Sequence, residues 1–200
     1  IPANQPVPEK VHRINEMIKD KYDLKTVQGL SKKQLAKRYG LKLFNTLNDA
    51  FSDLFGYVPL NDKQKEFYIN QYFPFLDKRL ICLVVDKNDD VVAFGISMPS
   101  LSNALRKCKG RLFPFGWIHL LKALKNFENI DLYLNGVKPE WQNKGIHSIY
   151  YAEMNKQYIK LGSKMAIADP QLETNQAANI WKKYDSRIAI RRRAYIKTIE

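Results

Sequence analysis

The sequence lacks the features that mark several classes of protein. Its longest unbroken apolar run, Leu80–Val85, has six residues, whereas a membrane-spanning helix needs about 20. Two cysteines are too few for a disulfide framework or a zinc cluster, and both are expected to be ordinary buried thiols in a reducing compartment. Residues 1–8 hold neither a basic region nor an apolar stretch, unlike a signal peptide. These absences predict a cytoplasmic protein without a membrane span.

The sequence does have a high aromatic content and an uneven positive charge. Ten Phe and 11 Tyr among 45% apolar residues exclude intrinsic disorder and supply a core for one large domain or two small ones. The net charge is +13, and residues 101–200 carry 18 basic and 8 acidic groups against 15 and 12 in residues 1–100. An anionic partner would meet the second half: a polyphosphate cofactor, an acidic carrier protein, a nucleic acid or an anionic membrane. No aromatic stacking motif accompanies Arg191–Arg193, which disfavours a nucleic acid.

Apolar spacing, capping boxes and turn residues predict the order of the secondary-structure elements. Gly40 is expected to end one helix, and a turn at 87–90 is expected to join the two strands of a hairpin. The expected helices are one after Pro8 with the stripe Val11, Ile14, Ile18 and Tyr22, then 31–40, 43–55, 61–72, two within 99–129, 145–161 and 175–184. The expected strands are 24–30, 79–86, 91–98, 130–137, 164–169 and 187–199.

This order, an antiparallel meander that runs into a β-α-β unit, indicates an α+β or mixed α/β fold. We expect a central, mostly antiparallel sheet flanked by helices, with a helical insertion at 99–129 before the fourth strand. Residues 1–21 are expected to form a linker and an N-terminal helix, and residues 22–200 a single domain. The proline-rich start without an initiator Met fits a linker that follows a missing first domain.

The segment with the clearest chemical meaning is the loop 142–147, Gln-Asn-Lys-Gly-Ile-His, between an expected strand and an expected helix. Backbone N–H groups at a helix N-terminus are unpaired and the helix dipole is positive there, so such a turn can hold a phosphate or pyrophosphate. Gly145 would let the backbone approach this ligand, and Lys144 would add positive charge.

The loop resembles the acyl-CoA loop of the GNAT superfamily of N-acetyltransferases. Gln142 and Gly145 fill two of the three defining positions of Gln/Arg-x-x-Gly-x-Gly/Ala, and His147 stands where a small residue is usual. The lead-in Val-Lys-Pro-Glu-Trp at 137–141 and the element order over residues 22–198 support the resemblance. The stretch 98–116 is also similar to the C-terminal half of an uncharacterised bacterial two-domain GNAT-like group.

The resemblance implies a GNAT-like acyl-CoA N-acyltransferase fold, with acetyl-CoA or another acyl-CoA as cofactor. The strand residues would pair with the pantetheine arm, and the loop would hold the pyrophosphate. Gly136 would permit close approach, or would mark a simple bulge. A bulky His147 would crowd, avoid or hydrogen-bond the pyrophosphate, and Asn175 would contact the cofactor arm or cap a helix. The implied cofactor-binding residues are Asn135, Gly136, Val137, Gln142, Asn143, Lys144, Gly145, Ile146, His147 and Asn175.

The catalytic residues are less clearly marked. The family's acid is a Tyr seven residues after the Asn, a position held here by Lys182, so Tyr184 is the candidate acid. Asp131 and Tyr133 share one face of their strand by alternation, and Asp131 is the candidate base for the amine proton; a simple strand-start role is its alternative. No ligand cluster for a metal is present, and none is expected.

The predicted function is an N-acyltransferase, with acetyl the expected group, acting on an unknown small-molecule or peptide amine by direct attack on the thioester. One alternative is a non-catalytic GNAT-fold half that supports a partner domain, which the misplaced Tyr184 and the bulky His147 favour. Another is a carrier-protein- or tRNA-dependent acyl or aminoacyl transferase, which the basic second half favours. The insertion 99–129 would cap the acceptor pocket, pack against a preceding GNAT-like domain or a second copy, or lie on a membrane surface, in that order of preference.

Overall fold

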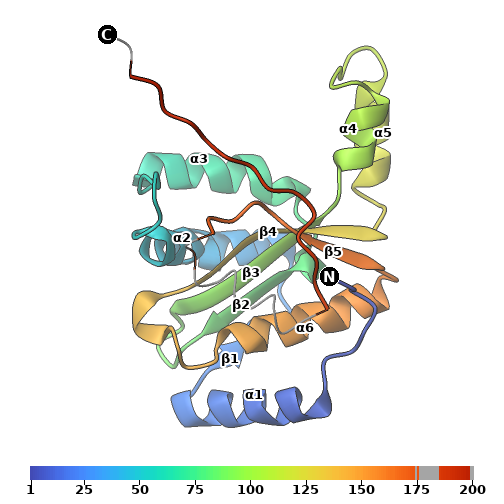
Figure 1. Ribbon diagram of the computed structural model, residues 1–200. Helices are drawn as coiled ribbons and strands as arrows, with labels where there is room; N and C mark the ends of the chain where they lie inside the picture. The colour runs from blue at the N-terminus through green and yellow to red at the C-terminus, as the bar shows by residue number, and fades with distance from the viewer. Residues whose placement is uncertain (174, 176–184, 199–200) are drawn as a thin grey trace.

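The computed structural model describes residues 1–173, 175 and 185–198, and its centre is a five-stranded sheet (Figure 1). The strands lie in the order β1-β2-β3-β4-β5, which is also their order along the chain. Neighbours are antiparallel except β4 and β5, which run parallel. The strands are β1 (Lys25–Thr26), β2 (Ile81–Val85), β3 (Val91–Pro99), β4 (Asn129–Val137) and β5 (Met165–Ala168). The predicted α+β fold with a mostly antiparallel sheet is confirmed.

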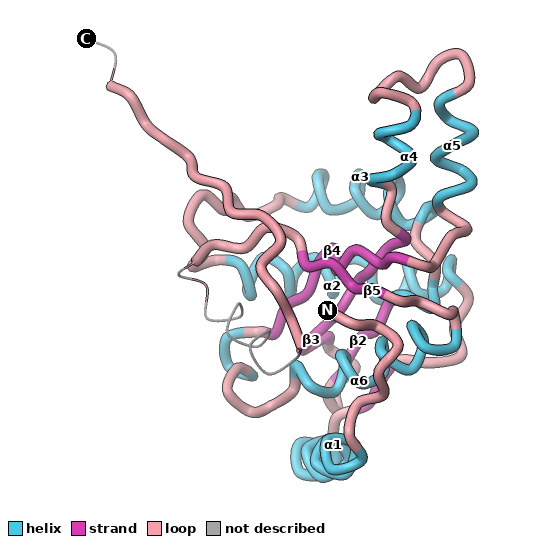
Figure 2. Tube along the Cα trace, turned by 45° about the vertical axis from the view of Figure 1, so that its right-hand side comes forward, coloured by secondary structure: helices cyan, strands magenta, loops and turns pink. Residues whose placement is uncertain are grey.

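Helices cover both faces of this sheet (Figures 1 and 2). One face packs against α6, with α1 on its outer side, and the other packs against α2, with α3 beside it. The predicted helical insertion before the fourth strand is formed by α4 and α5. The helices are α1 (Glu9–Tyr22), α2 (Lys32–Phe51), α3 (Asp62–Tyr72), α4 (Ser102–Lys107), α5 (Gly116–Ala123) and α6 (His147–Lys160).

Two apolar clusters hold the layers together, one on each face of the sheet. Ile130 and Tyr150 lie in the cluster beneath α6, whereas Leu43, Leu83 and Phe94 lie in the cluster beneath α2, and all five are buried. Full burial of an apolar side chain of this size contributes about 1.5–3 kcal/mol. The central strands β2 and β3 bury side chains on both faces, which fixes the position of the sheet between the helices.

The capping boxes are confirmed, but the predicted helix end at Gly40 is wrong. Ser31 caps α2 through Gln34, and the helix then continues without a break through Gly40 to Phe51. A Cβ added at Gly40 would lie 2.9 Å from Ile69 Cδ1 in α3. This glycine therefore allows α2 and α3 to approach each other and does not end the helix.

Two further sequence expectations need correction. The first strand is only Lys25–Thr26, and the described residues 187–198 form no strand. The outer edge of β5 pairs with the first residues of the chain instead: Ala166 N–H donates to Ile1 O at 2.8 Å, and Ala3 N–H donates to Lys164 O at 3.0 Å. The first residues of the chain therefore occupy the outer edge of β5 as far as Ala166.

Candidate functional site

Strand β4 changes its pairing halfway along its length. Its parallel pairing with β5 ends at Leu132. The register against β3 then skips Tyr133, which makes Tyr133 the extra residue of a β-bulge. From Leu134 to Val137, within the described part of the chain, β4 pairs with β3 alone. The second half of β4 therefore has one open edge.

The open edge of β4 presents the backbone of Asn135 and Val137. Lys138 N–H donates to Val92 O at 2.9 Å, which fixes the alternation of the ladder between β3 and β4. In an antiparallel pair, alternate residues bond to the neighbouring strand. Gly136 therefore bonds toward β3, whereas the N–H and C=O groups of Asn135 and Val137 point to the open side, where Val137 O already accepts from Gln142 Nε2. An extended amide-containing ligand could add to this edge as a strand.

The loop after β4 leads from a short 3-10 turn, Pro139–Trp141, into the N-terminus of α6. Asn143 (φ 60°) and Gly145 (φ 77°) both adopt left-handed backbone conformations, which Asn and Gly tolerate best. Among the described residues, the backbone N–H groups of residues 143–146 donate to no protein acceptor. Unpaired donors in succession at a positive helix end suit the oxygen atoms of a phosphate or pyrophosphate.

The side chains of the loop are fixed by contacts with its surroundings. Gln142 Nε2 donates to Val137 O at 3.2 Å and ties the loop to the end of β4. Lys144 Nζ lies 4.7 Å from the ring centroid of Trp141 and 5.4 Å from that of Tyr22, so cation–π contacts hold this ammonium beside the loop. The side chain of Ile146 is buried, which leaves only its backbone for a ligand.

Helix α1 braces this loop from behind. The buried Asn15 donates from Nδ2 to Ser148 O at 3.0 Å, and its Oδ1 accepts a hydrogen bond from the Ser148 hydroxyl. That hydroxyl is also 2.7 Å from Gly145 O. A Cβ added at Gly145 would lie 2.9 Å from Ile18 Cδ1, so α1 approaches the turn directly. The first turn of α6 is thus held in place by side chains of α1.

Carboxylates and tyrosines gather where β4 and β5 separate. Burial raises the pKa of Asp131, and this effect outweighs a hydrogen bond from Ser100 that lowers it. Burial and the nearby charge of Asp131 both raise the pKa of Asp169, which follows β5 directly. The pKa of Tyr133 is raised by burial and by its neighbours Tyr72, Asp169 and Tyr68. This cluster of negative charge and aromatic rings suits a cationic amine.

The structure brings most of the expected site residues to one end of the sheet, around β4 and the start of α6. The end of β4 holds Asn135 and Val137, and the loop 142–147 follows it and leads into α6, of which His147 is the first residue. At Gly136 an added Cβ would lie 2.9 Å from Phe94 Cε1 and 3.0 Å from Ala50 Cβ. Close packing against α2 therefore explains this glycine, and the bulge lies at Tyr133 instead.

The expected residues beyond β5 are only partly described. Asn175 N–H donates to Leu172 O at 3.0 Å. Tyr184, the candidate acid, and the predicted helix 175–184 lie outside the described residues, apart from Asn175 itself.

Sequence reasoning missed Asn15, Asp169 and the α3 tyrosines. Asn15, and not Ile14, takes the inner position of the α1 stripe, since Ile14 is exposed. The spacing of Val11 and Ile18 allows either residue to face inward, so the pattern held a weak signal for Asn15. Asp169 meets Asp131 only through the parallel register of β4 and β5, which no local pattern reveals.

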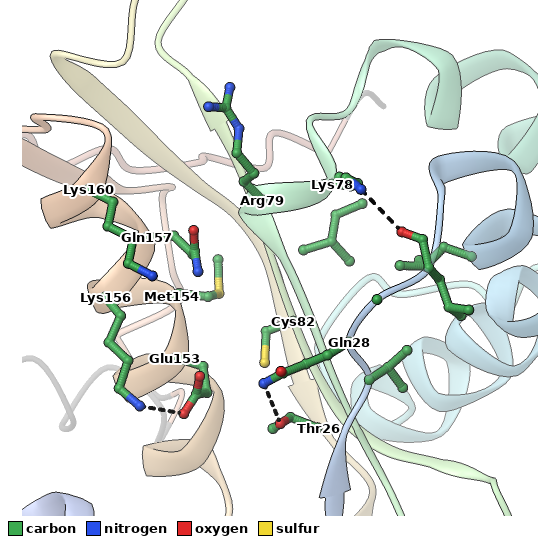
Figure 3. A pocket seen from close by; sticks show the side chains of 15 residues that line it. Thr26, Gln28, Lys78, Arg79, Cys82, Glu153, Met154, Lys156, Gln157 and Lys160 are labelled. Carbon is green, nitrogen blue, oxygen red and sulfur yellow. Dashed lines mark hydrogen bonds and ion pairs between the residues drawn. The ribbon is translucent and has the colours of Figure 1, made fainter.

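A separate cavity of about 360 Å³ lies at the other end of α6 (Figure 3). Basic side chains line it, but protein acceptors already engage three of them. Lys156 pairs with Glu153 at 2.8 Å, and Lys78 donates to a backbone carbonyl at 3.5 Å. Arg79 pairs at 2.6 Å with the carboxylate two residues before it. None of the residues that line this cavity belongs to the loop 142–147, and we assign the cavity no role.

Comparison with known sequences gives one distant relative. No family model matches the chain. The bacterial ceramide synthase of Caulobacter vibrioides is 29% identical over 102 residues, which are 50% of this chain and 26% of that protein. The chain therefore spans about a quarter of the length of this curated relative.

Comparison with solved structures identifies the fold. An aminoglycoside acetyltransferase from an uncultured soil metagenomic sample matches 91% of this chain and 99% of its own, with a TM-score of 0.52 and 13% identity. The aminoglycoside acetyltransferase AAC(6')-Iy, bound to a bisubstrate analogue that contains CoA, matches 88% and 99%, with a TM-score of 0.51 and 9% identity. An apo variant of agmatine N-acetyltransferase matches 82% of each chain, with a TM-score of 0.50 and 13% identity. The chain has the fold of the GNAT N-acetyltransferases.

Proposed function

We propose that the protein is an N-acyltransferase that takes an acyl group from acyl-CoA and passes it to an amine. One observation carries the proposal: the open edge of β4 runs directly into unpaired N–H groups at the start of α6, with two carboxylates at its other end. Solved structures of the same fold are N-acetyltransferases, one of them bound to an analogue that contains CoA. We place the transferase domain in residues 22–200, with α1 bracing it.

Each part of the site has a role in this proposal. The N–H groups of residues 143–146, with Lys144 beside them, hold the pyrophosphate. The backbone of Asn135 and Val137 pairs with the amides of the pantetheine arm, as an added strand would. This pairing places the thioester near the bulge at Tyr133, beside Asp131. The acyl-CoA supplies an activated carbonyl carbon and a thiolate leaving group.

The carboxylates attract and deprotonate the acceptor. Asp131 and Asp169 give the separation point of β4 and β5 a negative potential, which draws in an ammonium group. The bound ammonium group first gives one proton to the solvent and becomes a neutral amine. The amine nitrogen then bonds to the carbonyl carbon and loses its second proton to the Asp131 carboxylate, directly or through water. The carbon–sulfur bond then breaks, and the thiolate accepts a proton from the solvent or an acid such as Tyr184.

The curated relative suggests an acceptor class. A ceramide is an amide of a long-chain amino alcohol, so a ceramide synthase joins an acyl group to a lipid amine. Among the described residues, Ile167 and Met165 leave part of β5 exposed and apolar close to Asp169, which fits an acceptor with a long apolar chain. We therefore rank long-chain amines above aminoglycosides and polyamines as acceptors.

The first test is ligand-induced thermal stabilisation. The melting temperature is measured with CoA, acetyl-CoA and a long-chain acyl-CoA, with ATP as a polyphosphate control, at 50 and 300 mM salt. At 100 times Kd, binding adds about 2.7 kcal/mol, which for a chain of this size raises the melting temperature by roughly 5–10 °C. A CoA-selective rise that survives 300 mM salt supports the proposal. A rise that ATP matches and salt abolishes would favour an acidic carrier or tRNA as the donor instead.

The second test separates an enzyme from a non-catalytic half. Thiol release from acyl-CoA is followed with long-chain amines, aminoglycosides and polyamines as acceptors, using the wild type and Asp131→Asn. Acceptor-dependent release that Asp131→Asn reduces at least about 100-fold, the usual contribution of a general base, supports catalysis. CoA binding with no release for any amine class would support the non-catalytic alternative.

A further inference from the structure

The insertion between β3 and β4 is a helical hairpin that stands away from the sheet (Figures 1 and 2). Helices α4 and α5 pack against each other, and residues 108–115 form the tip between them. The tip is ordered by its own hydrogen bonds: Trp117 Nε1 donates to Pro114 O at 2.9 Å, and Trp117 N–H donates to Leu112 O at 3.1 Å. The hairpin does not fold over the open edge of β4.

The tip exposes large apolar side chains. Phe113 is 89% exposed and Phe115 is 70% exposed, and Leu112 and Trp117 beside them are each about half exposed. A core-facing amphipathic helix would bury such residues, yet these lie in the turn between α4 and α5 and in the first turn of α5. Exposed aromatic residues gathered at one projecting point indicate a contact surface.

The charge around these aromatic residues is of one sign. Residues 99–127 contain no Asp or Glu. The basic residues of the hairpin are Arg106, Lys107, Lys109, Arg111, Lys122 and Lys125, all of them exposed. Every partner that covers the aromatic tip must therefore also accommodate several uncompensated positive charges.

We propose that this hairpin docks on an anionic phospholipid surface, with Phe113 and Phe115 inserted at the headgroup boundary and the basic residues on the lipid phosphates. Aromatic side chains favour that boundary, and Lys and Arg are attracted by anionic headgroups. A second copy of the chain is a poorer partner, because it would bring two hairpins of like charge together. A projecting convex tip also suits a deformable surface better than a preformed groove.

The position of the hairpin gives this docking a consequence. Ser100 N–H donates to Asn129 O at 2.8 Å, so the two ends of the hairpin meet at the sheet. Asp131 lies two residues after Asn129 and pairs with Met98 of β3, close to this base of the hairpin. A docked hairpin therefore turns the carboxylate end of β4 toward the lipid surface, at a distance set by the lengths of α4 and α5. This consequence, unlike the docking itself, rests on the proposed function: it would give the acceptor site access to a lipid amine.

The test is co-sedimentation of the full chain with vesicles, without any CoA. Vesicles of phosphatidylcholine alone are compared with vesicles that also contain a quarter of phosphatidylglycerol, at 50, 100 and 300 mM salt. We expect binding to the anionic vesicles only, weakening as salt rises. Phe113→Ser with Phe115→Ser should weaken binding at least about tenfold. Phe55→Ser is the matched control, because Phe55 is 87% exposed outside the hairpin and should not affect binding.

The charge contribution has its own pair of variants. A basic residue near an anionic surface is worth about 1 kcal/mol, or roughly fivefold in affinity, so Lys107→Gln with Arg111→Gln should weaken binding about 25-fold. Lys33→Gln with Lys63→Gln removes the same charge from α2 and α3, and should weaken binding much less. All substituted side chains are exposed, and unchanged melting temperatures would show that the variants remain folded.

A probe on the hairpin reports insertion directly. Cys82 is buried, and burial raises the pKa of its thiol to about 12, so a neutral-pH thiol reagent reacts with the partly exposed Cys108. An environment-sensitive fluorophore on Cys108 should brighten and shift to the blue with anionic vesicles.

No sedimentation with anionic vesicles, or equal losses for Phe55→Ser and the tip variant, would overturn the proposal. A dimer in solution that the tip variant dissociates, without vesicle binding, would assign the hairpin to a second copy.

Discussion

A substitution at Gly145 tests whether the turn before α6 holds the pyrophosphate. Gly145 has φ 77°, and an added Cβ would lie 2.9 Å from Ile18 Cδ1. A non-glycine residue in the left-handed region costs about 1–2 kcal/mol, so Gly145→Ala should lower the melting temperature by about 2–8 °C. The strain and the contact with α1 should also displace the N–H groups of residues 143–146.

Gly162 supplies a matched control at the opposite end of the same helix. It has φ 72°, and an added Cβ would meet nothing within 4 Å. Gly162→Ala should therefore lose similar stability from backbone strain alone, while the turn at 143–146 keeps its geometry. The two variants separate a general loss of stability from a local loss of ligand binding.

The assay is the melting temperature of each variant with and without CoA. A tenfold loss of affinity is 1.4 kcal/mol, which should cut the CoA-induced rise for Gly145→Ala by about 3–6 °C. The rise for Gly162→Ala should equal that of the wild type. Ile18→Val removes the contacted Cδ1 and should restore part of the rise when combined with Gly145→Ala. An undiminished rise in Gly145→Ala would refute the assignment of this turn to the pyrophosphate.

Three further substitutions have defined outcomes. Asp131→Asn should raise the melting temperature at pH 7, because burial raises the pKa of this carboxyl. In melting scans at successively lower pH, this gain should shrink as the wild type takes up its proton. Asp89→Asn should do the opposite: the Tyr39 hydroxyl lowers the pKa of Asp89, so stability is lost at pH 7 and the difference from wild type disappears as acid protonates Asp89. Asn15→Ala should cost about 1–3 kcal/mol in urea unfolding, because it removes both hydrogen bonds between the buried Asn15 and the partly buried Ser148.

Local signals in the sequence were sufficient for much of the fold. The capping boxes at Ser31 and Asn61 satisfy their own backbone donors, so their sequence pattern alone locates the helix starts. The hairpin and the insertion follow from turn residues and from the change of apolar period. The prediction of a helix end at Gly40 was wrong because the role of this glycine depends on Ile69, a residue of another helix. A glycine that ends a helix and a glycine that allows close packing look alike in sequence.

The candidate site was predictable only in part, for a related reason. The loop 142–147 is contiguous, so its pattern survives in the sequence. The carboxylate pair is not: Asp131 and Asp169 meet because β4 and β5 run parallel in one register. The bulge at Tyr133 carries no sequence mark either, because the register shift is a property of the pairing between β3 and β4 and not of either strand alone.

The bulge explains how one strand can serve two purposes. Before Tyr133, β4 is an interior strand whose edge is filled by β5, and its side chains Ile130 and Leu132 pack in the core under α6. After Tyr133 the alternation is reversed: Leu134 packs in the cluster under α2, and the edge that β5 has left becomes available. If Tyr133 were an ordinary strand residue, strict alternation would put Leu134 on the same face as Ile130 and Leu132, and Leu134 would leave its cluster. The bulge therefore keeps both cores filled while it opens an edge of the sheet at the point where the carboxylates lie.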